Sequence, residues 1–216
     1  LYRIDGIILG KDTDKHINFL KGQFIFLDCS FFLFMKRCQW VGDDPLYIKY
    51  HDEEWGKPVY DDKILFEFLL LETFQAGLSW LTILKKRENF RKAFDGFDYT
   101  KIAKYSEVKF QILINDSGII RNKLKIKAAT TNAQAFLKIQ NEFGSFSKYI
   151  WGFINHKPIK NHFLSSSEVP ANSPLSDQIS LDLKKRGFKF VGSTIVYAHM
   201  QATGMVNDHI IGCVAR

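Results

Sequence analysis

Residues 61–76, DDKILFEFLLLETFQA, indicate the fold class of this chain because apolar side chains recur in them at helical spacing. Asp61 or Asp62 can cap the helix, whose apolar stripe carries Ile64, Leu65, Phe68 and Leu69. Further helices are expected from Ser79 toward Phe94 and over residues 101–114, 122–143, 145–153, 176–187 and 191–200. Alternating, strand-like runs are scarce, so the sequence predicts an all-α fold.

The composition suits one folded domain with a polyanionic partner. The 216 residues are 46% hydrophobic and 15% aromatic, which is enough for a core and disfavours disorder. Residues 1–34 hold four Lys or Arg and four Asp, so the whole formal charge of +7 belongs to residues 35–216. Such a charge favours nucleic acid as a partner, although an inert basic surface would carry it as well.

The sequence also bears on location and on where the domain starts. Three cysteines do not make a disulfide framework, so a reducing cytoplasm is expected. No apolar run in the sequence reaches the roughly 18 residues that span a bilayer, and no membrane partner is expected. The chain begins at Leu1, and its first methionine is Met35. We expect Met35 to be the natural start, with residues 1–34 an extension in front of a domain at 35–216.

Four side chains of the metal-ligand type lie at the two ends of that domain: Cys38, His51, His209 and Cys213. On a helix, His209 and Cys213 would share one face because they are four residues apart. Two Cys and two His complete a tetrahedral zinc shell, which would tie the chain ends together. Two buried thiols and two ordinary histidines are the alternative, because neither pair has zinc-finger spacing.

Glu72 is a carboxylate on an otherwise apolar helix stripe, four residues after Phe68. Burying a carboxylate is costly unless it is paired or used. Glu72 can therefore face a ligand pocket, lie at the margin of the stripe, or pair with a buried arginine. Residues 40–55 place two Trp and two Tyr around His51 in an expected loop, which either walls a pocket or covers the core.

Residues 115–122 place Gly118 in a turn between two expected helices. Such a turn lets backbone amides face outward and, with the helix start that follows, hold one phosphate. Basic residues follow the glycine, as in a helix-hairpin-helix that grips a DNA backbone without reading bases: Arg121, Lys123, Lys125 and Lys127. Two further basic clusters, at 85–87 and 184–186, are either phosphate contacts or solvated helix faces.

Taken together, these residues resemble a known family. Residues 35–213 are similar to the bacterial 3-methyladenine DNA glycosylase I family, which belongs to the helix-hairpin-helix superfamily. The matching motifs, in order along the chain, are RCQW (37–40), DPLY (44–47), YHDEEWG (50–56), LE (71–72), QAGLSW (75–80), LKKRE (84–88), GIIR (118–121), KKRGFKFVG (184–192) and NDH (207–209), with Cys213 after them.

The resemblance implies an enzyme that flips 3-methyladenine out of alkylated double-stranded DNA and hydrolyses its N-glycosidic bond. It implies that the catalytic carboxylate is Glu72, in a base pocket formed with Tyr47, Tyr50 and Trp80. It implies one structural Zn²⁺, held by Cys38, His51, His209 and Cys213. The residues that it implies at the DNA are Leu78, in the space left by the flipped base, with Gly118, Arg121 and Lys123.

Because the target base is cationic, its glycosidic bond is already weak, and recognition matters more than strong acid catalysis. We find no clear aspartate base or lysine nucleophile after the hairpin, so the expected enzyme is monofunctional and has no lyase step. Glu72, a tyrosine or a DNA phosphate could each activate the water.

Two rival classes are a zinc-stapled DNA-binding module without activity and a zinc hydrolase with an open metal position. A monomer is expected. The sequence leaves open how strictly the enzyme prefers 3-methyladenine over 3-methylguanine.

Overall fold

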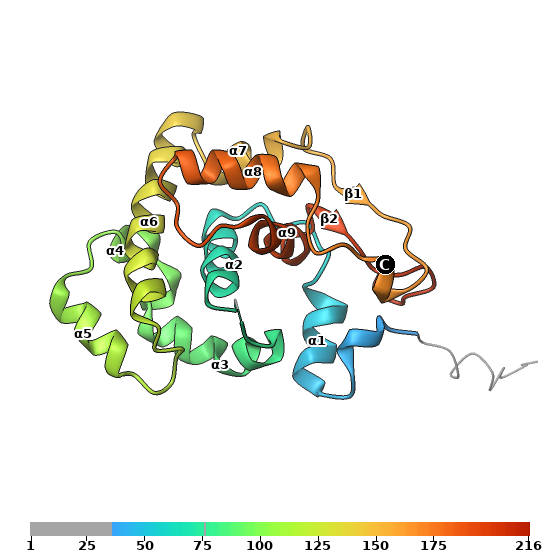
Figure 1. Ribbon diagram of the computed structural model, residues 1–216, viewed down its shortest axis with the longest axis horizontal. Coiled ribbons are helices and arrows are strands. Elements are labelled where there is room, and N and C mark those ends of the chain that lie inside the picture. Colours follow the sequence, from blue (N-terminus) through green and yellow to red (C-terminus); the bar gives the residue numbers. More distant parts are fainter. Residues whose placement is uncertain (1–35, 76) are drawn as a thin grey trace, which may run out of the picture. The chain divides into compact units, whose positions relative to one another are not determined.

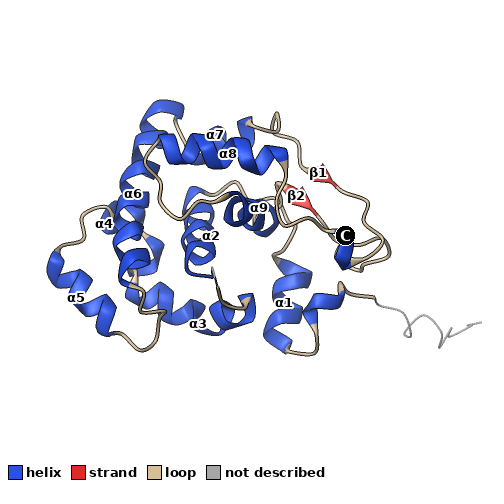
Figure 2. Cartoon of the chain, in the orientation of Figure 1, coloured by secondary structure: helices blue, strands red, loops and turns tan. Residues whose placement is uncertain are grey.

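The computed structural model describes residues 36–75 and 77–216, which are mainly helical, as the sequence predicts (Figures 1 and 2). The expected extension at residues 1–34 lies outside the described residues. The helices are α1 (Pro45–Glu53), α2 (Asp62–Gln75), α3 (Trp80–Ala93), α4 (Tyr99–Ile102), α5 (Glu107–Asn115), α6 (Lys123–Phe143), α7 (Phe146–Gly152), α8 (Pro174–Lys185) and α9 (Ser193–Ala202). Short 3₁₀ turns cover Gln39–Val41, Asp95–Phe97 and Ser166–Glu168, and strand β1 (Ile159–Lys160) pairs in parallel with β2 (Val206–Asn207).

Helix α2 packs against several other helices and is buried along most of its length. Asp61 caps it, because Oδ1 of Asp61 accepts hydrogen bonds from the amides of Lys63 and Ile64 at 2.9 and 3.0 Å. Every residue from Leu65 to Phe74 is buried, which exceeds the single apolar stripe expected from the sequence. A helix that is largely apolar all round belongs in a core, and α2 accordingly contacts α3, α6, α7 and α9.

Aromatic side chains fill the space between α2 and its neighbours. The ring of Phe66 lies 5.1 Å from that of Phe136 on α6, and the ring of Phe74 lies 4.9 Å from that of Phe90 on α3. Phe136 in turn stacks on Phe146 of α7 at 4.2 Å. Such pairs contribute about 0.5–1.5 kcal/mol each beyond the burial of their surface. The core therefore holds α2, which carries Glu72, in a fixed place.

Several expected helix starts are confirmed, because the side chains of Ser79, Asn122 and Ser145 accept hydrogen bonds from the first amides of α3, α6 and α7. These side chains satisfy amide groups that have no partner within the helix. Helix α8 begins at Pro174 instead of residue 176, because Ser173 is its N-cap and Ser176 closes a capping box with Ser173.

The single helix expected over residues 101–114 is wrong. Helix α4 ends at Ile102, and the hydroxyl of Ser106 accepts from the Lys109 amide to start α5 as a separate helix. The Ser106-Glu107 pair is a helix-start signal inside the stretch that was read as continuous.

Residues 45–53 form helix α1 and not the expected loop. Asp44 caps this helix by accepting from the Leu46 amide at 3.0 Å, and Pro45 occupies its first position. Proline suits that position because its missing N–H would have no partner there. Tyr47, Tyr50 and His51 therefore project from a helix.

The two ends of the described chain pair with each other. His209 and Cys213 lie on either side of a turn at residues 211–212, not on the helix considered above, and the Cys213 amide donates to the Ile210 carbonyl at 3.0 Å. The Val214 amide then donates to the Lys36 carbonyl at 3.1 Å. Among the described helices, none has the length and apolar character needed to cross a membrane.

Gly204 provides a test of how tightly the end of α9 is packed. Its φ is +66°, and a Cβ atom there would overlap the carbonyl group of Lys57 and the nitrogen of Pro58. Gly204→Ala should therefore lower the unfolding free energy, measured in urea, by at least about 3 kcal/mol. The alanine would be strained at this φ, and the backbone of Lys57 and Pro58 would have to move away from its Cβ atom. Gly187→Ala is the matched control, since its φ is +99° and nothing lies within 4 Å of its Cβ position. We expect that variant to lose only about 1 kcal/mol; equal losses would contradict the packing.

Candidate active site and metal centre

A cavity of about 350 Å³ opens between α1, α2, α9 and the turn at Ser166–Glu168. This volume lies in the range of small-molecule sites. Its walls include Tyr47, Tyr50, Glu72, Trp80, Ser166 and Gln201. The structure therefore brings the four residues expected in the base pocket to one cavity.

Glu72 is 4% exposed and lines this cavity. Burial raises the pKa of its carboxyl group to about 8, because desolvation disfavours the charged form. Glu72 makes no hydrogen bond or ion pair with any described residue, whereas Arg87, whose side chain is 11% exposed, pairs with Glu67 at 2.6 Å and with Glu54 at 2.7 Å. Of the three alternatives open for Glu72, the structure matches a carboxylate that faces a pocket.

The tyrosines at the cavity come from one face of α1. Tyr47 and Tyr50 are three residues apart, and the ring of Tyr50 lies 5.5 Å from that of Trp80 on α3. Burial raises the pKa of both hydroxyl groups, and the nearby Glu72 carboxylate raises it further. Both tyrosines therefore keep their protons and can act as hydrogen-bond donors.

Two polar atoms at the cavity are buried without a hydrogen-bond partner among the described residues. They are Nε1 of Trp80 and Oγ of Ser166. A buried donor without a partner costs about 1–3 kcal/mol, so both are suited to a ligand that enters the cavity. Sequence reasoning missed Ser166, because it belongs to an irregular stretch that carries no pattern pointing to a pocket.

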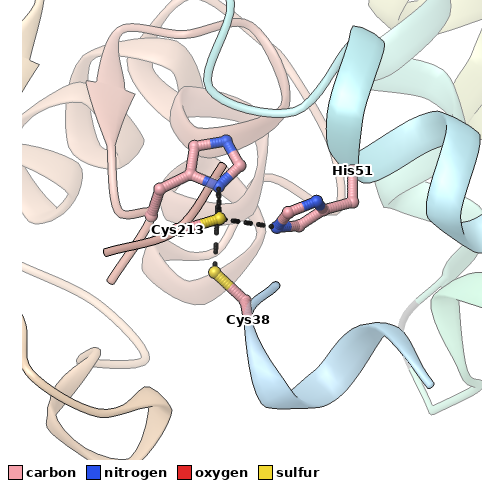
Figure 3. Close-up of side chains that lie close together, drawn as sticks. Cys38, His51 and Cys213 are labelled. Atoms are coloured by element: carbon pink, nitrogen blue, oxygen red, sulfur yellow. Dashed lines mark hydrogen bonds between the residues drawn. The ribbon is translucent and has the colours of Figure 1, made fainter. Parts of the chain in front are cut away.

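The four predicted metal-ligand residues meet in one buried cluster (Figure 3). Sγ of Cys213 lies 3.4 Å from Nε2 of His51 and 3.3 Å from Nδ1 of His209. Sγ of Cys38 lies 3.8 Å from Nδ1 of His209. Metal–ligand bonds of about 2.0–2.3 Å in a tetrahedron imply ligand separations of about 3.3–3.8 Å. The donor set and its spacing therefore fit a metal ion.

Further contacts orient the ligands of this cluster. Nδ1 of His51 lies 2.7 Å from the Asp52 carboxylate, and Nε2 of His209 lies 3.0 Å from the Trp55 carbonyl. Such partners fix the ring nitrogen that faces a metal. Burial raises the pKa of the Cys38 thiol to about 12, so a thiolate at this position needs a cation beside it. The cluster could thus hold a metal ion, as the sequence predicts.

The cavity and the metal-type cluster share one wall. The ring of Trp40 lies 4.9 Å from Tyr47 at the cavity and 5.3 Å from His51 in the cluster. Trp55 also lines the cavity and packs against His209 at 4.6 Å. Trp40 and Trp55 are not among the residues expected at the base, but pocket walls are one of the two roles expected for their aromatic stretch, and both residues line the cavity.

The residues expected at DNA lie in two turns. Leu78 is 38% exposed in the turn between α2 and α3. Arg121 and Lys123 are exposed where the turn after α5 leads into α6. The Gly118 amide does not face outward as expected, because it donates to the Asp116 carboxylate at 2.7 Å. Gly118 instead permits close packing, since a Cβ atom would lie 3.2 Å from Asn89.

Several other basic residues have structural contacts. Lys125 is expected among the basic residues that face DNA, but it is buried and donates to the Phe74 carbonyl at the end of α2, at 3.1 Å. In the cluster at 85–87, Lys85 pairs with Asp44 at 2.8 Å, and Lys86 donates to the Ser117 and Gly118 carbonyls. Lys86 thus ties α3 to the turn between α5 and α6. The cluster therefore has structural contacts, while the Lys85 side chain is 57% exposed to solvent.

Comparison with known proteins identifies the family. A family model for methyladenine glycosylase matches residues 40–216. The chain belongs to the methyladenine glycosylase family. It is 51% identical to DNA-3-methyladenine glycosylase 1 of Escherichia coli K12 over 179 residues, which are 83% of this chain and 96% of the relative. The resemblance read from the motifs and the expected enzyme class, a glycosylase, are thereby confirmed.

Solved structures of methyladenine glycosylases share the fold. The crystal structure of a 3-methyladenine DNA glycosylase I matches with a TM-score of 0.82 and 49% identity, covering 84% of this chain and 100% of the other. The enzyme from Staphylococcus aureus, whose structure addresses recognition of 3-methyladenine, matches with a TM-score of 0.81 and 39% identity, covering 84% and 96%.

The raised pKa of Glu72 predicts how stability varies with pH. The folded protein holds the Glu72 proton up to about pH 8, whereas the unfolded chain releases it at about pH 4.3. Between these values the unfolded state binds fewer protons, so Glu72 lowers the unfolding free energy by at most about 1.4 kcal/mol per pH unit. Glu72→Gln removes this loss, and its stability advantage over the native chain should grow from about pH 5 to about pH 8 in urea unfolding.

Glu53→Gln is the control, because Glu53 is exposed on α1. That variant should follow the native chain at every pH. A Glu72→Gln curve parallel to the native one would contradict the burial of an unpaired carboxyl group.

Proposed function

We propose that residues 35–216 form a monofunctional DNA glycosylase that removes 3-methyladenine from alkylated double-stranded DNA. The observation that carries the proposal is Glu72, a buried carboxylate that faces an aromatic cavity and has no partner among the described residues. The relatives are named DNA-3-methyladenine glycosylases, which agrees with this substrate. We expect the enzyme to act as a monomer in the cytoplasm.

The damaged base reaches the cavity by leaving the DNA stack. Tyr47, Tyr50 and Trp80 surround it there, and each electron-rich ring attracts a cation by roughly 0.5–2 kcal/mol. 3-Methyladenine in DNA is cationic and adenine is not, so the rings favour the damaged base. Glu72 accepts a hydrogen bond from the exocyclic amine of the base, and such charge-assisted bonds are about twice as strong as neutral ones.

Ionisation of Glu72 adds selectivity. In the empty cavity its pKa of about 8 keeps the carboxyl group protonated near neutral pH. A cationic base supplies the charge that favours the carboxylate, so its entry drives release of that proton. A neutral base supplies no such charge and meets an uncharged carboxylic acid.

Hydrolysis then breaks the bond between the base and the sugar. The bonding electrons go to the cationic base, which leaves as a neutral molecule. Water then adds to the oxocarbenium-like sugar and releases one proton to solvent as the sugar hydroxyl forms. Among the described residues that line the cavity, none is a lysine, so no amine is in place for a covalent step with the sugar. This supports a monofunctional enzyme without lyase activity.

The turn between α5 and α6 acts, in this proposal, as a helix-hairpin-helix that grips the DNA backbone. Arg121 and Lys123 are exposed beside the start of α6 and contact phosphates. Nζ of Lys86 donates hydrogen bonds to the Ser117 and Gly118 carbonyl groups of this turn, both at 3.2 Å. Leu78, exposed between α2 and α3, fills the space that the flipped base leaves in the duplex.

Cys38, His51, His209 and Cys213 hold one structural Zn²⁺ in the proposed enzyme. Four protein ligands complete a tetrahedron and leave no position for water or substrate, which argues against a zinc hydrolase. A DNA-binding module without activity would have the charge and the zinc cluster. It would have no use for Glu72, whose burial lowers stability at neutral pH.

Loss of the Glu72 charge should abolish most of the activity. With methylated DNA as substrate, Glu72→Gln should release 3-methyladenine at least about 100-fold more slowly, because it removes charge stabilisation in the pocket. Binding to undamaged duplex should stay within about twofold of the native value. Chromatography of the released bases measures the rate and identifies the base. The control Glu53→Gln should be fully active, and native release rates in Glu72→Gln would remove Glu72 from the mechanism.

Removal of one metal ligand should cost both metal and stability. His209→Ala should lose bound zinc, measured by elemental analysis, and several kcal/mol of unfolding free energy, since structural zinc contributes on the order of 10 kcal/mol. His162→Ala is the control, because His162 is exposed and lies outside the cluster. A His209→Ala protein as stable as the native chain would show that the cluster does not clamp the chain ends.

A further inference from the structure

We propose that a second DNA-backbone contact surface lies beside the hairpin, at the turn that joins α8 to α9. Its side chains surround a groove of about 380 Å³ and are Leu124, Lys127, Ala128, Thr131, Lys189 and Phe190. We call this surface the Phe190 groove. The proposal rests on the proposed function, because the groove holds the same duplex from which the base is flipped.

Phe190 has a strained backbone that packing of its own ring does not explain. Its φ is +56°, in the left-handed region, which is unfavourable for a bulky aromatic residue. The side chain is 41% exposed, so burial of the ring offsets only part of the strain. Strain that the surrounding structure enforces is a marker of functional positions.

Asn132 of α6 enforces this conformation. It is 1% exposed, and its side-chain oxygen accepts from the Lys189 amide at 2.7 Å. Its side-chain amide donates to the Lys189 carbonyl at 3.0 Å. Phe188 and Val191 anchor the turn in the core on either side. The exposed side chains of Lys189 and Phe190 are therefore presented from a rigid turn.

The chemistry of the groove matches a DNA backbone. Lys127 and Lys189 are exposed, and no acidic residue lines the groove among the described residues. Leu124 is 68% exposed and adds apolar surface beside Phe190, which suits contact with deoxyribose between two phosphates. Lysine is depleted in interfaces between proteins, whereas it supplies the charge that binds duplex DNA. The groove thus favours DNA over a protein partner.

The groove also continues the surface assigned to the hairpin. Leu124 follows Lys123 on α6, and Lys127 lies about 6 Å from Lys123 along the helix axis. Nζ of Lys127 lies over the ring of Phe110 on α5 at 5.0 Å. The connection between α8 and α9 runs beside α6 (Figure 1), as the bonds from Asn132 to Lys189 require. A duplex held at Arg121 and Lys123 would reach the Phe190 groove next.

Binding of a short undamaged duplex to the full chain tests this surface. The double variant Lys127→Ala with Lys189→Ala should bind about 10-fold more weakly in fluorescence anisotropy. Its plot of log affinity against log salt should be shallower by about 2, one for each lost phosphate contact. Phe190→Gly should bind about threefold more weakly while unfolding at the same urea concentration or a higher one, because glycine adopts the left-handed region freely. Lys148→Ala, an exposed lysine on α7, should change neither quantity.

If the double variant binds the duplex with the affinity and salt slope of the native chain, the proposal is wrong. The groove would then be a surface for another partner, such as a protein. Base release from methylated DNA, measured with the native chain, separates the two proposals. If the native chain releases no methylated base but the double variant loses duplex binding, the groove stands and the glycosylase assignment fails. If base release is normal and duplex binding by the double variant is native, the groove fails and the assignment stands.

Discussion

The desolvation of one carboxylate is the constraint that organises this molecule. A pKa of about 8 for Glu72, against about 4.3 in an unfolded chain, corresponds to a cost on the order of 5 kcal/mol when the group ionises. Only a rigid scaffold can keep such a group from turning toward water. Glu72 lies on α2, whose residues from Leu65 to Phe74 are all buried. If the same carboxylate lay on a loop, a small movement of the backbone would expose it to solvent and restore its hydration.

The metal-type cluster borders the same cavity, because Trp40 and Trp55 line the cavity and contact histidines of the cluster. Helix α1 carries Tyr47 and His51 one turn apart, and Trp40 contacts both. Trp55 lines the cavity and packs against His209. An ion that joined the chain ends would thus also fix two rings of the cavity wall. The distance in sequence between these ligands is therefore an advantage, because one site orders segments from both ends of the described chain.

The sequence predicts the helices well where a capping side chain precedes a long apolar pattern, as at Ser79 and Asn122. It fails where two short helices share one pattern, since only the Ser106 cap separates α4 from α5. The ligand cluster and the Glu72 pocket were found through motif resemblance, because spacing alone left each with alternatives. Ser166 and Asn132 could not be found in this way. Ser166 matters only because the fold brings it to the cavity, and Asn132 because it bonds to Lys189, 57 residues away. Lys125 shows the same limit, as its burial depends on α2 ending beside it.

In the proposed enzyme, the magnitude of the Glu72 shift decides between bases. At neutral pH, ionising a group with a pKa of about 8 costs about 1.4 kcal/mol. A hydrogen bond to a charged group contributes about 1.5–3 kcal/mol, and each aromatic ring adds roughly 0.5–2 kcal/mol for a cation. For a cationic base, the sum of these contributions exceeds the cost of ionisation, so Glu72 ionises as the base enters the cavity. Neutral adenine lacks the cation–π contribution, so its hydrogen bond alone must offset the cost and its net gain is smaller. A carboxylate with an ordinary pKa would be ionised beforehand, so it would offer the same acceptor to every adenine and discriminate less.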